Sequence, residues 1–416
     1  MPGSFRHART RRALSPQLAG ARRGARSAVL GLAVLLAIVT AAVGLVAASG
    51  RWAGAASTVD AARPARQGEP RTVAGASTCP RPAPTTASGY QHLFDSLYGA
   101  WAGGDQAVSV ALPDGRTLWI FADTLSGRRS ASGGYAPGLG MRHNSFVIQD
   151  RGCLSALNST PLPDMDSSHW YWPSSALVAG GRLYVFAIRV GRTGTGAFSF
   201  ATYGSSLASF TLPRTGAPRL QSIVALPRGN ADGTILWGAG VVAAGPRVYV
   251  YGTQAVPLRL GFGRRLLVAW APTGRLADPH AWHFRAATAF TSRPQDARPV
   301  LPAADGVSTS VSVLPGPAGR VSVISKLNEV FGRYVAEWTA PTPAGPFTLS
   351  RPQLLSAPSL TKPGELLYTA QAHQESRLAN GALLVTVCRN NTRFAAVEAD
   401  SRLYRPQFSA VAAPVS

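Results

Sequence analysis

The chain contains little acid and almost no lysine. Its 416 residues include 41 Lys and Arg but only 19 Asp and Glu, which gives a formal net charge of +22. Lys326 and Lys362 are its lysines, and 41 less these 2 leaves 39 arginines. Proteins that bind nucleic acid gather such charge on a basic helix or beside base-stacking motifs. This chain spreads its charge thinly, so we expect no nucleic-acid partner and only weak attraction to anionic surface polymers.

Motifs that bind metals and cofactors are also missing. The sequence has no CxxC pair and no GxSxG, GxxxxGK[ST], HExxH or dinucleotide GxGxxG motif followed by a helix. Their absence argues against structural zinc, a serine-hydrolase elbow, a P-loop, a zinc protease and a Rossmann domain. We therefore predict a protein without a cofactor or a bound metal. Calcium on a central axis is an option that no cluster of ligand residues supports.

The N-terminal residues predict export. Residues 1–26 carry seven arginines and no acid, and residues 27–49 carry no charge. An uncharged run of this length approaches the ~20 residues that cross a bilayer, and the preceding arginines favour a cytoplasmic N-terminus. We expect a transmembrane signal anchor, with a cleaved signal peptide as the alternative because VAAS and AGAAS offer cleavage sites. The rest of the chain then faces the extracellular side of the cell membrane or is secreted.

Residues 50–88 and the cysteines fit an exported protein. The segment is rich in Ala, Arg, Pro, Ser and Thr and lacks apolar periodicity, which predicts a disordered linker. In an oxidising compartment cysteines commonly pair. Cys79 and Cys153 are the candidates for a disulfide that brackets the first structural unit, and this pairing leaves Cys388 as a buried thiol.

Beyond the linker, short strands replace long amphipathic helices, for which YQHLFDSLYGAW is the best short candidate. A glycine turn followed by an apolar strand recurs as GRTLWIF, GRLYVF, GPRVYVY, GRVSVI and GALLVT, and another strand precedes each turn. The spacings are 65, 65, 73 and 62 residues when the runs are aligned on Leu118, Leu183, Val248, Val321 and Leu383. Five such hairpins predict an all-β, five-bladed β-propeller over residues 89–416, with a double β-sandwich as the alternative.

The first hairpin, GGDQAVSVALPDGRTLWIFADT, has an aspartate near each open end. In a propeller blade the start of the first strand and the end of the second share one rim, so Asp105 and Asp123 should meet there. If Pro113 to Gly115 form a three-residue loop, the aspartates face each other with Cβ atoms roughly 5 Å apart. If Asp114 and Gly115 alone form the turn, the side chains of Asp105 and Asp123 point to opposite faces of the sheet. The shared rim is the prediction, and both registers stay open.

The aspartate pair indicates acid/base chemistry. Two neighbouring carboxylates repel each other, so one keeps its proton to a higher pH than the other. Glycoside hydrolysis uses that difference, because one group protonates the leaving oxygen while the other activates water or attacks the sugar. Asp105 and Asp123 are therefore the candidate catalytic pair, with Glu375 in YTAQAHQES held as a third acid. The plainer interpretation is that these aspartates complete turns and bond backbone amides.

Other side chains near the same rim are candidates for substrate binding. Polar ones can hydrogen-bond a carboxylate or a sugar hydroxyl, and aromatic rings can stack on apolar sugar faces. The alternative is structural, because a lone histidine is often a satisfied core group and aromatic residues often wedge neighbouring blades apart. The candidates are Arg142, His143, Asn144, Trp170, Trp172, Trp237, Tyr368, His373 and Asn390.

One protein family resembles this chain in the segments GGDQAVSVALPDGRTLWIFADT, RHNSFVIQ, YWPSSALVAGGRLYVF, ILWGAGVV…VYVYGT and YTAQAHQE…GALLVTVCRNN. It comprises exported bacterial five-bladed propellers, long described only as a domain of unknown function, and includes endo-D-arabinanases that act on actinobacterial cell-wall arabinan. The resemblance covers most of residues 90–410 and is strongest in the first predicted blade. More distantly, the chain resembles propeller glycosidases of the arabinanase and levansucrase type, in which an aspartate starts the first inner strand.

The resemblance implies roles for individual residues. Asp105 matches the family's first-blade acid, and Asp123 matches the acid of its Phe-Gly-Asp-Thr strand end. The family's His-Asn matches the HN of RHNSFVIQ, and its His-Pro-Glu segment matches His373 and Glu375. Three motifs depart from the family pattern. Gly-Asp-Gly reads Gly-Asp-Gln here, Phe-Gly-Asp-Thr reads Phe-Ala-Asp-Thr, and His-Pro-Glu reads His-Gln-Glu.

The combined prediction is a glycoside hydrolase of the cell envelope whose partner is a wall polysaccharide such as arabinan or arabinogalactan. The departures, together with inner strands two and three that carry no matching acid, keep open a non-catalytic carbohydrate-binding propeller that uses the same rim. A scaffold for partner proteins is a third alternative, and it would lack an acidic pocket.

Overall fold

The computed structural model describes most of the chain after residue 78. The predicted cytoplasmic segment, the predicted membrane segment and most of the predicted linker lie outside the described residues. Among the residues that are described, no helix has the length and apolar composition to cross a bilayer. The described residues are 79–196, 199–214, 216–256, 263–327, 334–350, 352–354 and 363–414.

Strands dominate the described residues, and they form antiparallel sheets that follow one another along the chain. The first large sheet has the order β2-β3-β6-β7, formed by β2 (Val108–Ala111), β3 (Thr117–Phe121), β6 (Ser145–Asp150) and β7 (Cys153–Ala156). The second has the order β8-β9-β10-β11, formed by β8 (His169–Ala179), β9 (Arg182–Arg192), β10 (Phe200–Thr211) and β11 (Arg219–Ala225).

Three further large sheets follow. The third contains β14 (Leu236–Ala244), β15 (Arg247–Gln254), β16 (Arg265–Pro272), β17 (His283–Arg285) and β18 (Phe290–Thr291). The fourth contains β19 (Ser312–Pro315), β20 (Val321–Lys326), β21 (Tyr334–Ala340), β22 (Thr348–Leu349) and β23 (Gln353–Leu354). The last contains β24 (Glu365–Arg377), β25 (Leu383–Asn391) and β26 (Pro406–Val411).

Smaller elements decorate these sheets. A three-stranded sheet has the order β1-β4-β5, formed by β1 (Gly99–Gly104), β4 (Thr124–Gly127) and β5 (Gly140–Arg142). A ribbon pairs β12 (Gly229–Asn230) with β13 (Gly233–Thr234). The helices are α2 (Ala87–Asp95) and α3 (Phe394–Ala399), with short 3₁₀ turns η2 (Thr273–Arg275), η3 (Pro279–Ala281), η4 (Pro294–Asp296) and η5 (Pro317–Gly319).

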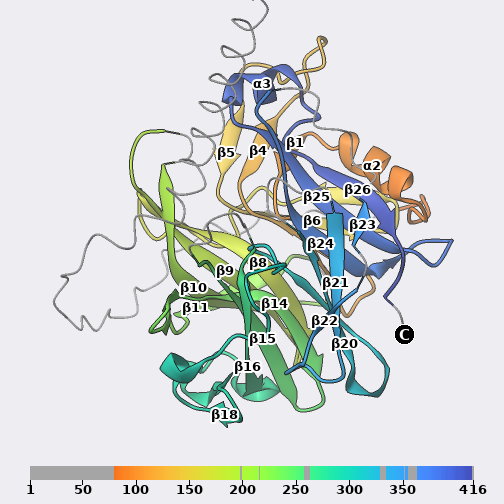
Figure 1. The fold of residues 1–416 in the computed structure, drawn as a ribbon. Helices are drawn as coiled ribbons and strands as arrows, with labels where there is room; N and C mark the ends of the chain where they lie inside the picture. The colour runs from red at the N-terminus through yellow and green to blue at the C-terminus, as the bar shows by residue number, and fades with distance from the viewer. Residues whose placement is uncertain are drawn as a thin grey trace, which may run out of the picture. The chain divides into compact units, whose positions relative to one another are not determined.

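The first strands of the five large sheets lie against one another. β2 contacts β8, β8 contacts β14, β14 contacts β19, β19 contacts β24, and β24 contacts β2, which closes a ring. In Figure 1 the sheets accordingly succeed one another around a common centre, from yellow through green to blue. The fold is therefore all-β and propeller-like, and the starts of these first strands meet at one end of the ring.

The five hairpins that the sequence predicts are present. Its glycine-led runs form β3, β9, β15, β20 and β25, and each pairs with the strand before it. The glycine of each run has a positive φ, for example +86° at Gly115. Glycine recurs at these turns because a residue with a side chain adopts that backbone conformation only with strain.

Apolar side chains between neighbouring sheets form the core. Trp237 at the start of the third sheet is fully buried with Phe186 of the second sheet and Trp282. Burial of side chains this large stabilises a sheet interface by about 25 cal/mol per Å² of apolar surface. Large aromatic side chains thus fill the space between neighbouring sheets. This is the structural role that the sequence analysis gave as the alternative for the predicted rim aromatic residues.

The short helix α2 fastens the N-terminal side of the domain to the ring. It begins after Thr86, whose Oγ1 accepts a hydrogen bond from the backbone N–H of Gly89 at 3.0 Å. Its buried side chains Tyr90 and Phe94 pack against aromatic residues of β3 and β26, among them Phe408. The helix thus covers the junction between the first and the last large sheet.

The folded part begins earlier than the sequence predicts. Cys79 forms a disulfide with Cys153 of β7, and Cys388 is a buried free thiol. Residues 79–88, which the sequence assigned to the linker, therefore include the disulfide and the first turn of α2. Composition alone placed the boundary too late because this stretch is rich in proline, serine and threonine.

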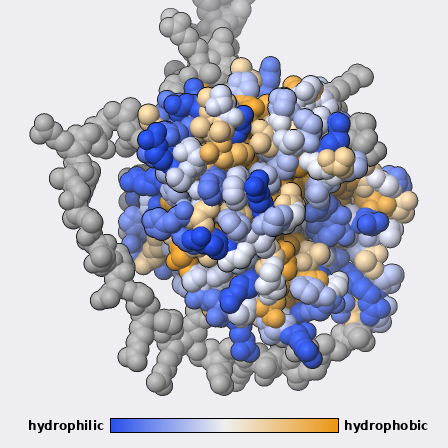
Figure 2. Space-filling view, turned by 90° about the horizontal axis from the view of Figure 1, so that it is seen from below, coloured by the Kyte–Doolittle hydropathy of each residue, from blue (hydrophilic) through white to orange (hydrophobic). Residues whose placement is uncertain are grey.

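The surface of the domain is mixed in polarity. Figure 2 shows hydrophilic residues around small apolar patches on the face turned towards the viewer. The large apolar side chains exposed among the described residues include Met141, Tyr334 and Phe394, which lie on separate elements. Single exposed apolar residues of this kind are ordinary on protein surfaces.

Candidate functional site

The first hairpin brings the two aspartates opposite each other. Leu112 donates its N–H to the carbonyl of Arg116 at 2.8 Å, so the turn is a three-residue loop. The strand register continues this pairing, and the N–H of Asp105 donates to the carbonyl of Asp123 at 3.2 Å. Of the two registers that the sequence left open, the structure adopts the one that pairs Asp105 with Asp123.

A left-handed turn follows Asp105. Gln106 has a φ of +73° and Ala107 a φ of +48°, although neither is glycine. The carbonyl of Asp105 accepts hydrogen bonds from Ala107 N–H and Ala122 N–H, both at 3.0 Å. Sparsely populated backbone conformations persist only where the surroundings hold them, and they concentrate at functional sites. This turn therefore fixes the backbone from which the Asp105 side chain projects.

Two tyrosines hold one oxygen of Asp105. Its Oδ2 accepts hydrogen bonds from the hydroxyl of Tyr368 on β24 at 3.0 Å and from the hydroxyl of Tyr404 at 3.4 Å. Its Oδ1 is buried and has no hydrogen-bond partner among the described residues. Burial, followed by the charge of Asp123, raises the pKa of Asp105 from 3.8 to about 8, against the opposing effect of both hydroxyls. The group is therefore protonated at neutral pH, and Oδ1 is the oxygen left to carry the proton.

Two N–H groups hold one oxygen of Asp123. Its Oδ1 accepts hydrogen bonds from Nδ1 of His143 at 3.0 Å and from Nε1 of Trp172 at 2.7 Å. The side chains of Asp123 and His143 are 14% and 23% exposed, so this part of the site reaches solvent. The ring of Trp170 stacks on the imidazole of His143, with centroids 4.3 Å apart.

The two aspartates thus occupy different environments. Asp105 is half-buried with an enclosed Oδ1, faces neutral hydroxyls and has a raised pKa, whereas Asp123 accepts two N–H donors on one oxygen. Each is anchored through one oxygen only. Paired carboxyl groups whose surroundings separate their protonation states are suited to one acid role and one base or nucleophile role.

The sequence analysis did not assign three residues to the site, although it named Cys388 as a buried thiol. Tyr404 lies in the turn after α3 with a φ of +65°, and burial together with Asp105 raises its pKa well above the ordinary value. Asp164, in the exposed loop before β8, has a raised pKa because of partial burial, with His143 lowering it and Asp123 raising it. Cys388 accepts the N–H of Gln106 at 3.0 Å. The sequence did offer a signal for Asp164. It lies in the loop that leads into β8, the first strand of the second sheet, and loops that lead into first strands lie at this rim.

Asn390 lies in the site, as its predicted position implies. Its Nδ2 contacts the hydroxyl of Tyr368 at 3.3 Å, which in turn donates to Asp105. Burial, and then Asp105, raises the pKa of Tyr368 well above its ordinary value. The phenol therefore stays neutral and remains a donor across the physiological range.

Arg142 and Asn144 have structural surroundings. Asn144 is fully buried, accepts the N–H of Leu162 at 2.9 Å and donates to the carbonyl of the same residue at 2.8 Å. Arg142 donates to backbone carbonyls, including that of Ala100, and burial lowers its pKa. The structure pairs it with neither aspartate. Both residues shape the loop that carries His143.

Trp237 does not reach the site. Its side chain has no exposed surface, and its ring lies 5.4 Å from that of Phe284 in the core. The sequence prediction of a sugar-stacking surface at this position is therefore wrong. The first strand of the third sheet carries its tryptophan between sheets, and the aromatic residues near Asp123 are Trp170 and Trp172.

Glu375 and His373 lie towards the other end of β24. Glu375 is seven residues beyond Tyr368, which at ~3.3 Å per residue corresponds to roughly 20 Å along the strand. Ser109 of β2 donates to Oε1 of Glu375 and lies 2.5 Å from Nδ1 of His373. Burial raises the pKa of Glu375 and lowers that of His373 to about 3. This cluster joins the first sheet to the last, and Glu375 is not placed with the aspartate pair.

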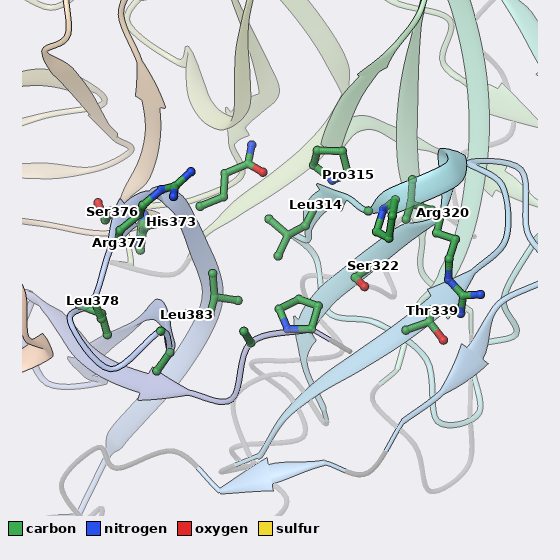
Figure 3. Close-up of a pocket in the computed structure, with 18 of the residues that line it drawn as sticks. Leu314, Pro315, Arg320, Ser322, Thr339, His373, Ser376, Arg377, Leu378 and Leu383 are labelled. Atoms are coloured by element: carbon green, nitrogen blue, oxygen red, sulfur yellow. The ribbon is translucent and has the colours of Figure 1, made fainter. Parts of the chain in front are cut away.

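A cavity of about 530 Å³ lies at that other end. Its wall comes from the β19–β20 and β24–β25 turns, and Figure 3 shows apolar side chains such as Leu314 and Leu383 around it. Arg320 and Arg377 edge it, and the described residues that line it include no acidic side chain. The cavity therefore lacks the carboxyl pair that the opposite rim supplies.

The described residues offer no site for a metal ion. Within them, no group of three or more His, Cys, Asp and Glu side chains is arranged to hold an ion. Around Asp105 the neighbouring groups are phenols and a thiol rather than further carboxylates. The chemistry of the site is therefore that of a carboxyl pair.

Fold and site together define a propeller-like β-protein with a paired-carboxylate centre. The chain belongs to the family described as a domain of unknown function, DUF5005, which matches residues 88–413. A comparison with curated proteins found no match.

Solved structures support the fold. The chain is similar to a provisionally assigned hydrolase of Bacteroides ovatus ATCC 8483, at 21% identity over 78% of this chain and 88% of that one, with a TM-score of 0.62. Weaker similarities are to an endo-arabinase of Bacteroides thetaiotaomicron VPI-5482 (9% identity, 76% and 98% coverage, TM-score 0.45) and a mutant alpha-L-arabinanase of Cellvibrio cellulosa (12%, 74% and 91%, TM-score 0.40). At these identities the likeness concerns the fold alone.

Proposed function

We propose that the protein is a glycoside hydrolase with an endo-D-arabinanase-like activity on arabinan or arabinogalactan. Its fold is a five-bladed β-propeller, which the closed ring of five first strands supports. The carrying observation is the pair Asp105 and Asp123, placed opposite each other in environments that favour different protonation states. The uncharged segment 27–49 supports an enzyme that acts outside the cell membrane, as an anchored or a secreted protein, and the family resemblance supports an actinobacterial envelope.

Asp105 is the general acid of this mechanism. Its proton, held on Oδ1, passes to the glycosidic oxygen as the bond between that oxygen and the anomeric carbon breaks. Tyr368 and Tyr404 occupy Oδ2 and so leave the proton a single position. Because the conjugate carboxylate is costly in this surrounding, the pKa of Asp105 is raised, and the group is still protonated and able to donate at neutral pH.

Asp123 acts on the other side of the bond. As a carboxylate it either takes a proton from an attacking water or bonds to the anomeric carbon, and the anomer first released distinguishes the two routes. His143 and Trp172 fix its orientation through Oδ1 and leave the second oxygen for the reaction. Trp170 is buried and stacks on the imidazole of His143, so it supports His143 rather than offering a face to the sugar.

Sugar release from arabinogalactan by the full chain tests the proposal. Asp105→Asn and Asp123→Asn should each lower release by at least about 10²-fold, the scale of one acid or base group. Glu375→Gln is the matched control, because it removes a buried acid outside the site and should retain release. All variants need unchanged melting temperatures or higher ones, so that unfolding does not explain the loss.

A non-catalytic carbohydrate-binding propeller is the second candidate, and the buried position of Asp105 Oδ1 favours it. It predicts that the wild type binds arabinogalactan through the same rim and releases no sugar. Trp172→Ala should then weaken binding, whereas Asp105→Asn should leave it unchanged. Release of sugar by the wild type, lost in Asp105→Asn, contradicts this candidate.

A further inference from the structure

Gln106 spans the space enclosed by the ring of first strands. Its side chain is 7% exposed, and its Nε2 donates to the carbonyl of Ser174 at 3.1 Å and to the hydroxyl of Ser310 at 2.7 Å. Ser174 belongs to β8 in the second sheet, and Ser310 directly precedes β19 of the fourth sheet. One amide group thus connects the first sheet to two others across the centre.

The backbone of Gln106 is attached to the last sheet as well. Its N–H donates to Sγ of Cys388 on β25 at 3.0 Å, and the same sulfur accepts the hydroxyl of Thr369 at 3.0 Å. The left-handed φ at Gln106 would relax without such contacts, because a side chain makes that conformation unfavourable. These bonds therefore stabilise the turn that carries Asp105.

The groups facing Asp105 cannot by themselves keep water away from it. They are Asp123 at the end of β3, Tyr368 on β24, Cys388 on β25 and Tyr404 after α3, and none of them carries a positive charge. The adjoining β1 contributes no titratable side chain. A glycine in place of Gln106 would empty the part of the ring centre that its amide occupies between Ser174 and Ser310, one residue along the chain from Asp105, and a polar-lined space of this kind takes up water.

We propose that Gln106 is a positioning residue for Asp105, which holds the left-handed turn and fills the enclosed space so that the Asp105 carboxyl group stays dry. The proposal deepens the proposed function, since it rests on Asp105 as the acid. Glycine suits the backbone, but glutamine adds volume and two hydrogen bonds.

Three substitutions separate volume from hydrogen bonding. Gln106→Gly relieves the left-handed strain and opens the enclosed space. Gln106→Met keeps nearly the same volume and the same strain but removes both donated hydrogen bonds. Gln106→Ala opens a smaller space, and it replaces the glycine variant in the test if that variant fails to fold.

The direct measurement is the pKa of Asp105 in the full chain, followed by the ¹³C signals of aspartate carboxyl groups in a pH titration. The Asp105 signal is assigned by its loss in Asp105→Asn. In the wild type it should titrate near pH 8. In Gln106→Gly, entry of water should lower the titration midpoint by about 1–2 pH units, while Gln106→Met should stay within about half a unit of the wild type.

Two results would overturn the proposal. An unchanged midpoint in the glycine variant means that Gln106 does not keep Asp105 dry. A midpoint lowered equally by methionine means that volume is not the cause. The titration needs no enzymatic activity. The proposal for Gln106 can therefore fail in the titration while the proposed hydrolase activity is confirmed by sugar release, and the hydrolase proposal can fail while the titration supports the role of Gln106. If sugar release is measured, the alkaline limb of its pH profile should move downwards in Gln106→Gly with the same midpoint.

Discussion

Replacing Asp105 by asparagine should make the protein more stable, increasingly so as the pH rises. Burial, and then the charge of Asp123, raises the pKa of Asp105 from 3.8 to about 8 in the folded protein. The unfolded chain keeps the ordinary value, so between these limits the folded state binds a proton that the unfolded state has lost. Linkage then requires that the free energy of unfolding decrease with pH across this window.

The size of the effect follows from the shift in pKa. Each pKa unit corresponds to about 1.4 kcal/mol. The amount by which Asp105 lowers the free energy of unfolding is therefore near zero at pH 4, about 4 kcal/mol at pH 7 and, as an upper bound, roughly 6 kcal/mol above pH 8. Asparagine removes the titration while its carbonyl still accepts from Tyr368 and Tyr404. The advantage of Asp105→Asn should therefore grow by about 1.4 kcal/mol per pH unit between pH 4 and 8 and then level off.

Denaturant unfolding of the wild type and of Asp105→Asn at pH 4, 6, 7, 8 and 9 measures this advantage. The difference between the two proteins isolates Asp105, because all other titrating groups are shared. Asp123→Asn is the comparison variant. It should destabilise by weakening the contacts with His143 and Trp172, and because it removes the second cause of the raised Asp105 pKa, its gain at alkaline pH should be smaller than that of Asp105→Asn. A difference between Asp105→Asn and wild type that stays constant from pH 4 to 8 would refute a buried, protonated acid.

Three further outcomes follow from single contacts. Tyr368→Phe removes a donor to the charged form of Asp105, so the alkaline limb of the pH profile of sugar release should move upwards by up to about one unit; a downward shift would contradict that contact. Cys153→Ser opens a cross-link over 74 residues and should lower the free energy of unfolding by about 4 kcal/mol in denaturant titrations. Trp172→Phe keeps the ring but removes the N–H donated to Asp123, so kcat should fall about tenfold or more at an unchanged melting temperature, and unaltered kcat would count against this role.

The placement of the aspartate pair could be predicted because hairpin register depends on local features. The length of the turn decides whether two residues at the open end of a hairpin lie opposite each other. The sequence left two turn lengths open. It could not choose between them, because Asp114-Gly115 favours a tight turn while Pro113 suits a longer one. In the structure the hydrogen bond from the Leu112 N–H to the Arg116 carbonyl shows that the loop has three residues.

Residues from distant parts of the chain were harder to place. Glu375 lies on the same strand as Tyr368. The spacing between the two residues in the sequence predicted that shared strand, but it did not predict which end of the ring Glu375 faces. Tyr404 gave no signal, because a tyrosine in a turn after a six-residue helix has no pattern that points to a carboxyl group elsewhere. Trp237 was assigned to the rim by its place at the start of a strand, yet the same position lets a large ring fill the space between sheets.

The protonation states of the two aspartates depend on contacts that only the fold creates. In sequence the two groups look alike, each following small residues at a strand end. In the structure, phenols from the last sheet surround Asp105, while an imidazole and an indole from the first and second sheets face Asp123. Their assignment as acid and as base or nucleophile therefore rests on the closure of the ring.

Gln106 shows how contacts made by closure of the ring of sheets offset the strain of a locally unfavourable backbone conformation. A residue other than glycine in the left-handed region loses roughly 1–2 kcal/mol, and Ala107 beside it adds a second unfavourable φ. Each hydrogen bond from the Gln106 amide returns about 1 kcal/mol net, and both are made to sheets that the sequence places 68 and 204 residues away. The strained turn is thus stable only in the completed ring, so partial unfolding of the last or fourth sheet should release Asp105 to water before the hairpin itself opens.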